Sequence, residues 1–127
     1  MSKLIGFLLL IVGIIHLLPM TGLLGVERLN ALYGLSFNEP NLHILMRHRA
    51  VLFGLLGALL VAAAFLPGLR TIALIGGLVS VFSFLLLAWS EPLYNEALRR
   101  VIIADWLALV CLLVALVLHL RAGASTP

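Results

Sequence analysis

NLHILMRHRAVLFGLLGALLVAAAFL, the stretch from Asn41 to Leu66, joins a cationic head directly to an apolar run. The run has no charged residue from Ala50 onwards, which gives about 25 Å of helix at about 1.5 Å per residue. A bilayer core of about 30 Å needs about 20 apolar residues, so a helix that crosses it must begin before Ala50. This stretch therefore predicts a membrane-spanning helix whose start carries the cations.

The cationic head places four polar side chains at the edge of the membrane. Extending the helix backwards brings Arg47, His48 and Arg49 to the hydrocarbon boundary, and His43 lies one turn further out on the face of Arg47. Ionisable residues at such a depth mark sites of pairing or function. We therefore expect a functional site at this end of the helix.

Composition indicates an integral membrane protein. Of the 127 residues, 64% are hydrophobic and 10% are charged, whereas about a quarter are charged in soluble domains. Four apolar stretches have the length that a spanning helix needs. The sequence thus predicts an all-α, multi-pass protein of the cell membrane, a single transmembrane domain of residues 1–127 with spans at about 4–24, 46–66, 71–90 and 101–120.

The link between the first two spans predicts one further element. Val26, Leu29, Leu32 and Tyr33 recur at helical spacing, opposite polar residues. We interpret this segment as a short amphipathic helix at the membrane surface. The predicted fold is therefore a four-helix transmembrane bundle with a short amphipathic surface helix between spans one and two.

Charge and cysteine content narrow the choice of partners. The net charge of +3 comes from basic residues dispersed at the helix ends, which suits contact with lipid headgroups better than contact with nucleic acid. Cys111 is the single cysteine, so one chain can hold neither a disulfide nor a multi-cysteine metal site. We expect membrane lipids as partners, and neither nucleic acid nor a metal ion.

Small residues form seams along three of the spans. Gly6 and Gly13 share one face of the first span with His16, and Gly57 lies in a similar seam of the second. Such seams let neighbouring helices approach closely, and they leave room for a homo-oligomer or a partner membrane subunit. Serines such as Ser80 in the third span can bond to their own backbone or across a helix pair.

One mouth of the predicted bundle is polar. The links after the first and third spans lie on the same side of the membrane, and Asp105 lies about one turn inside the fourth span from that side. Arg47 and Arg49 point about 200° apart on a helix, so one can face Asp105 while the other reaches the headgroups. The charge pair either fixes only the helix register or also binds an anionic or carbonyl-bearing ligand.

The remaining polar residues of this mouth allow several ligands. His16 is typical of a hydrogen-bonded interior histidine, and Trp106 of an interfacial aromatic belt. A quinone needs hydrogen-bond donors beside an apolar slot, whereas a haem needs two facing histidines, for which no spacing signature exists. We therefore expect a quinone or a lipid rather than a haem, and our candidate ligand-binding residues are His16, His43, Arg47, His48, Arg49, Asp105 and Trp106.

The first span resembles that of a known family. Leu4-Ile5-Gly6 followed by Gly13-Ile14-Ile15-His16-Leu17 is similar to the pattern of the DoxX-like group of small bacterial membrane proteins. The resemblance implies a four-helix bundle in the bacterial inner membrane, some of whose relatives are linked to quinone-coupled redox complexes. It carries over no catalytic residues, and the Arg47-His48-Arg49 block is not part of the pattern.

Three functions fit these patterns. We favour a membrane protein whose polar mouth binds a lipid, a quinone or a partner subunit. The alternative is a small membrane enzyme that acts on a lipid-like substrate, with Asp105 and a histidine as acid and base. A small transporter fits worst, because the multidrug transporters of this size carry a membrane-embedded glutamate in the first helix, where this chain has His16.

Overall fold

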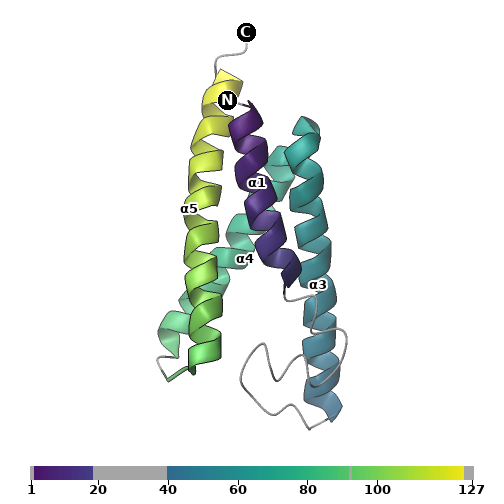
Figure 1. Cartoon of the computed structure of the whole chain (residues 1–127), viewed down its shortest axis with the longest axis vertical. Coiled ribbons are helices and arrows are strands. Elements are labelled where there is room, and N and C mark those ends of the chain that lie inside the picture. Colours follow the sequence, from purple (N-terminus) through teal and green to yellow (C-terminus); the bar gives the residue numbers. More distant parts are fainter. Residues whose placement is uncertain (1, 19–39, 92, 125–127) are drawn as a thin grey trace.

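The structure, a computed structural model, describes residues 2–18, 40–91 and 93–124, and these residues form four α-helices (Figure 1). No strand occurs among these described residues. A short 3₁₀ turn, η2 (Pro67–Leu69), joins the second helix to the third. The helices are α1 (Ser2–Leu17), α3 (Pro40–Phe65), α4 (Arg70–Ser90) and α5 (Glu96–Ala124).

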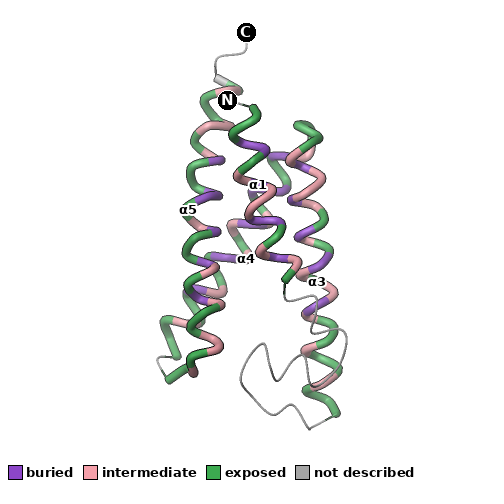
Figure 2. The backbone as a smooth tube through the Cα atoms, in the orientation of Figure 1, coloured by how far each residue is buried: buried purple, intermediate pink, exposed green. Residues whose placement is uncertain are grey.

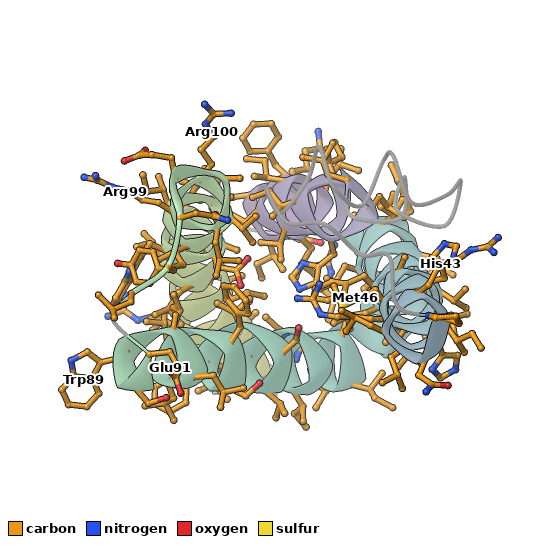
Figure 3. All side chains as sticks on the ribbon, turned by 90° about the horizontal axis from the view of Figure 1, so that it is seen from below. His43, Met46, Trp89, Glu91, Arg99 and Arg100 are labelled. Atoms are coloured by element: carbon orange, nitrogen blue, oxygen red, sulfur yellow. The ribbon has the colours of Figure 1, made fainter. Side chains whose placement is uncertain are left out.

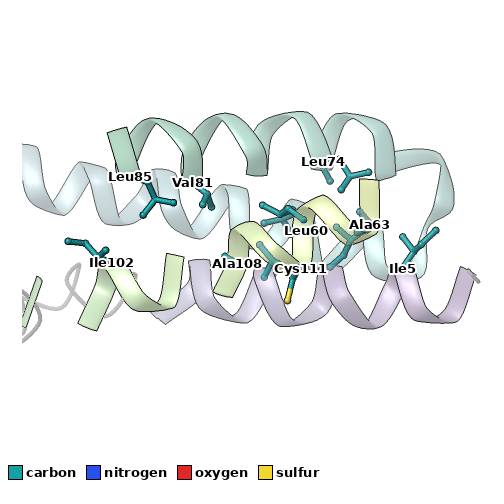
Figure 4. Close-up of a cluster of buried hydrophobic side chains, with 14 residues drawn as sticks. Ile5, Leu60, Ala63, Leu74, Val81, Leu85, Ile102, Ala108 and Cys111 are labelled. Carbon is teal, nitrogen blue, oxygen red and sulfur yellow. The ribbon is translucent and has the colours of Figure 1, made fainter. Parts of the chain in front are cut away.

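Each helix packs mainly on two neighbours. α1 packs against α3 and α5, and α4 packs against the same two helices. Figure 1 shows α4 running diagonally behind α1, with α3 and α5 on either side. Buried positions line the inward faces of all four helices (Figure 2). The core between them is aliphatic (Figure 4), and its largest fully buried apolar side chains are Ile5, Leu9, Val12, Leu60, Leu74, Val81 and Leu112.

The outer surface is apolar as well, as expected for helices in lipid. Three segments are long and apolar enough to cross a membrane, namely α3, η2 with α4, and α5. α1 is also apolar, but its 16 residues give about 24 Å of helix, less than a bilayer core. These are the helices of a small membrane protein. The predicted end of the first span, residues 19–24, and the predicted surface helix lie outside the described residues.

The local breaks in the sequence set the helix ends. The spanning helix begins before Ala50, as predicted, with Pro40 in its first turn, where the missing N–H costs nothing. The predicted third span, 71–90, matches α4 closely. α5 starts at Glu96 because the Oδ1 of Asn95 accepts a hydrogen bond of 2.8 Å from the amide of Leu98, and it continues past the predicted 101–120 span at both ends.

Glycines let α1 and α3 approach closely, which confirms this role for the small-residue seams. A Cβ atom added at Gly13 would lie 2.7 Å from Val61 Cγ2 and 3.1 Å from the carbonyl oxygen of Gly57. A Cβ atom added at Gly6 would lie 2.6 Å from the carbonyl oxygen of Ala64. Because backbone atoms cannot move aside as side chains do, only glycine fits at these crossings.

Substitution of Gly13 by Ala should therefore destabilise the protein despite the better helix propensity of Ala. We expect a loss of about 1–3 kcal/mol from overpacking, seen as a lower midpoint of thermal unfolding in detergent. Gly123→Ala is the matched control, because no atom lies within 4 Å of an added Cβ there. Equal midpoints for the two variants would contradict the close approach of α1 and α3.

Arg70 connects the end of α3 to the start of α1, a role that the sequence did not predict. Its side chain is only 5% exposed. Nε donates to the carbonyl of Ala63 at 3.1 Å, and Nη2 donates to that of Ala64 at 3.1 Å. Nη1 donates to Ser2 Oγ at 2.9 Å. Arg70 thus satisfies carbonyls that the end of α3 leaves without helical partners, and it ties them to the start of α1.

Arg70→Leu should cost about 2–5 kcal/mol of stability, because it leaves one buried and one partly buried carbonyl group without their donor. Arg121→Leu is the control, since Arg121 is an exposed cation in the last turn of α5, and Figure 1 shows this end of α5 near the start of α1. We expect the first variant to unfold at much lower temperature or denaturant concentration than the second. Similar unfolding curves would show that the three hydrogen bonds do not hold this end.

Candidate functional site

One cavity brings together three of the predicted site residues, each from a different helix. His16 of α1, Arg49 of α3 and Asp105 of α5 line a cavity of about 290 Å³, which we call the polar-mouth cavity. Its volume is near the lower end of the range for small-molecule sites. The other lining residues are mostly apolar and comprise Ile15, Leu18, Phe53, Ala97, Arg100, Val101 and Ala104.

His16 is held rigidly at the end of α1. Its side chain is 1% exposed, and its Nδ1 donates to the carbonyl of Val12 at 3.0 Å. In the neutral ring the other nitrogen, Nε2, accepts from the hydroxyl of Ser80 at 3.4 Å. The ring also packs against Phe53, with the ring centroids 5.6 Å apart. His16 is thus a hydrogen-bonded interior histidine that links α1 to α4.

Arg49 faces the interior, whereas Arg47, two residues earlier on the same helix, is exposed. The guanidinium carbon of Arg49 lies 4.5 Å from the ring centroid of Phe53 and 6.0 Å from that of Phe84. These distances are typical of cation–π contacts. Arg49 also lines a second cavity, of about 540 Å³, beside α4 and the start of α5. The contacts with Phe53 and Phe84 thus keep the guanidinium group between the polar-mouth cavity and this second cavity.

Asp105 is the least satisfied polar group of the site. Its side chain is 7% exposed, and within the described part of the chain its carboxylate accepts no hydrogen bond. Arg49 acts on it electrostatically but forms no direct ion pair with it. Among the described residues, the one ion pair is the exposed Arg99–Glu96 contact of 3.4 Å. A carboxylate buried in this way inside a span costs a few kcal/mol unless a partner reaches it.

The other four predicted residues do not line the polar-mouth cavity. Arg47 and His48 are exposed on α3, and His43 is half-buried, with no hydrogen-bond partner for its Nε2 among the described residues. In the end-on view of Figure 3, His43 lies across the end of the molecule from Arg100. Trp106 lines a separate apolar groove between α4 and α5. Its half-exposed indole suits contact with lipid.

Arg100, Phe53 and Ser80 belong to the site but were not among the predicted residues. Arg100 is exposed at the rim of the cavity, and Figure 3 shows its side chain extending from α5 at this end. The helical period of α5 could have indicated Arg100. Residues 97, 101, 104 and 105 recur on one face of this helix, and Arg100 lies at the edge of that face. The role of Phe53 and Ser80 depends on contacts between helices, for which the sequence carries no local pattern.

The polar side chains of the site offer hydrogen-bonding groups and charges. The described residues contain no group of three His, Cys, Asp or Glu side chains that could hold a metal ion. Comparisons with protein-family models, with curated proteins and with solved structures found no match to this chain. The function is therefore argued from the geometry of this cavity.

Ser80→Ala should lower stability by about 0.6–2 kcal/mol, because it removes the hydrogen bond between α4 and His16. Ser83→Ala is the matched control, since among the described residues Ser83 Oγ bonds only to the Ser80 carbonyl of its own helix, at 3.0 Å. The measurement is the free energy of unfolding in detergent. An equal effect of the two substitutions would contradict an interhelical role for Ser80.

Proposed function

We propose that the protein binds a membrane-soluble amphiphile, a quinone or a lipid, with the ligand's polar head in the polar-mouth cavity. The observation that carries this proposal is the convergence of His16, Arg49 and Asp105, from three helices, on one cavity with mostly apolar walls. Small-molecule sites combine such walls with a few placed polar groups. The cavity is too small for a whole lipid, but its volume suits a headgroup.

The charges favour a ligand head that is anionic or bears a carbonyl group. Arg49 and Arg100 both line the cavity, and guanidinium groups bind anionic groups and carbonyl oxygens through charge-assisted hydrogen bonds. The aromatic contacts of Arg49 fix the direction of its guanidinium, so less entropy is lost when a ligand binds. A positively charged donor near the headgroup level and an apolar wall below it are what a quinone or an acidic lipid needs.

We also propose an arrangement of the helices in the membrane. α1 would cross the bilayer as a fourth span, which makes the protein a four-helix transmembrane bundle, and the DoxX-like resemblance favours the bacterial inner membrane. The large apolar surface leaves room for a second copy or a partner subunit. An acid–base enzyme has less support, because both ring nitrogens of His16 are already engaged in hydrogen bonds.

A binding experiment with matched variants tests this proposal. The purified protein is titrated with a short-chain quinone and, separately, with dioleoylphosphatidylglycerol, and bound ligand is counted by native mass spectrometry. Arg49→Gln should weaken binding about 10- to 100-fold, because it removes a charge-assisted hydrogen bond. Arg47→Gln removes the same charge two residues away, outside the cavity, and should bind as the wild type does.

Two outcomes would overturn the proposal. The first is that neither the quinone nor the lipid binds in a one-to-one ratio. The second is that Arg47→Gln weakens binding as much as Arg49→Gln, because binding would then follow the net charge of the surface rather than the cavity.

A further inference from the structure

A separate cavity lies at the other end of the molecule, beside the buried side chain of Arg70. It has a volume of about 430 Å³, and residues of α1 and of the end of α3 line it. Figure 1 shows the start of α1 and the end of α3 at the same end of the structure. Ser2, Lys3 and Arg70 are the polar residues of its lining, and we call it the Lys3 cavity.

The charge of Arg70 has no carboxylate to balance it. All three hydrogen bonds of the guanidinium go to neutral acceptors, two backbone carbonyls and one hydroxyl. The sequence has no Asp or Glu in residues 1–26, 40–90 and 106–127, which include every segment around the Lys3 cavity. The end of α3 contributes about half a negative elementary charge, so it offsets only part of the positive charge. Since buried charges are normally paired, an anion from outside the chain fits here.

Hydrogen-bond donors extend from the guanidinium into the cavity. Ser2 Oγ accepts from Nη1 of Arg70 at 2.9 Å, and no other described residue bonds to it, so its own O–H can donate to a ligand. Lys3 is exposed and adds an ammonium group beside Ser2. A hydroxyl and an ammonium group in front of a buried guanidinium suit the oxygens of a phosphate.

The rest of the lining is mostly apolar and leads away from the charges. Phe7 and Leu10 follow Lys3 on one face of α1, at spacings of four and seven residues. Leu10 lies about 10.5 Å further along the helix than Lys3 by rise per residue. Phe65 of α3 also lines the cavity, and both phenylalanines are largely exposed. An anionic head beside Lys3 would therefore continue into an apolar groove, as a lipid requires.

We infer that the Lys3 cavity binds a phospholipid of net negative charge, such as phosphatidylglycerol. The phosphate lies against Lys3 and Ser2 in front of Arg70, and an acyl chain follows Phe7 and Leu10. A zwitterionic lipid fits less well, because its ammonium group would find no carboxylate at this end. This site is separate from the polar-mouth cavity and does not depend on the proposed function.

Three probes test the class of ligand. The purified full chain in an uncharged detergent is titrated with dioleoylphosphatidylglycerol, with dioleoylphosphatidylethanolamine, and with glycerophosphoglycerol, the headgroup without chains. Bound molecules are counted by native mass spectrometry. We expect phosphatidylglycerol to bind about 5- to 10-fold more tightly than phosphatidylethanolamine, because the latter brings an unpaired positive charge. Glycerophosphoglycerol should bind much more weakly, since it lacks the acyl chains.

Variants identify the cavity. Lys3→Gln should weaken the binding of one phosphatidylglycerol about fivefold, the contribution of one basic residue at the membrane surface. Arg121→Gln removes the same charge from the same end but outside the cavity, and it should bind as the wild type does. Arg49→Gln should keep the lipid that depends on Lys3, together with its preference over phosphatidylethanolamine, because Arg49 lines the other cavity. If Arg49→Gln does not fold, the comparison of Lys3→Gln with Arg121→Gln still decides.

Three outcomes would overturn the inference. Equal weakening by Lys3→Gln and Arg121→Gln would show that binding follows the net charge of this end rather than the cavity. Equal affinity of the Arg49→Gln protein for the two phospholipids would show that the lipid does not balance a charge. Binding of glycerophosphoglycerol as tight as that of the lipid would identify a soluble anion as the ligand. The proposed function stands or falls separately, since it depends on the response to Arg49→Gln alone.

Discussion

A polar group inside a membrane protein finds no water, and the structure is arranged around this constraint. Arg70 meets it with three hydrogen bonds to neighbouring carbonyl and hydroxyl groups, and His16 meets it through Val12 and Ser80. Asp105 does not meet it within the described residues. The first two groups therefore hold the helices together, whereas the third lines the polar-mouth cavity.

The two ends of the molecule therefore differ in what their polar groups do. At one end, Arg70 and the close approach of Gly6 to Ala64 lock α1 against the end of α3. At the other end, charged side chains border the polar-mouth cavity, with Arg49 held between two aromatic rings. Packing at the first end and along the core holds in place the three helices that line the cavity.

The sequence predicted what depends on local pattern. Hydropathy located the apolar helices, and proline and glycine marked their ends. The helical period predicted that one of Arg47 and Arg49 faces inward, and the structure shows that it is Arg49. Contacts between segments that are distant in the sequence could not be predicted from such local patterns. The hydrogen bonds of Arg70 require the end of α3 to meet the start of α1, and Phe53 becomes part of the site only because α1 brings His16 to it.

Photolabelling tests the central claim, a ligand head in the polar-mouth cavity, most directly. A phosphatidylglycerol with a diazirine near its headgroup would be bound to the full chain, irradiated, and its attachment sites mapped by peptide mass spectrometry. We predict labelling of Ile15, Leu18 and Val101, and its loss when unlabelled lipid competes. Labelling spread evenly over the exposed apolar surface, or concentrated in the Trp106 groove and insensitive to competitor, would contradict the account.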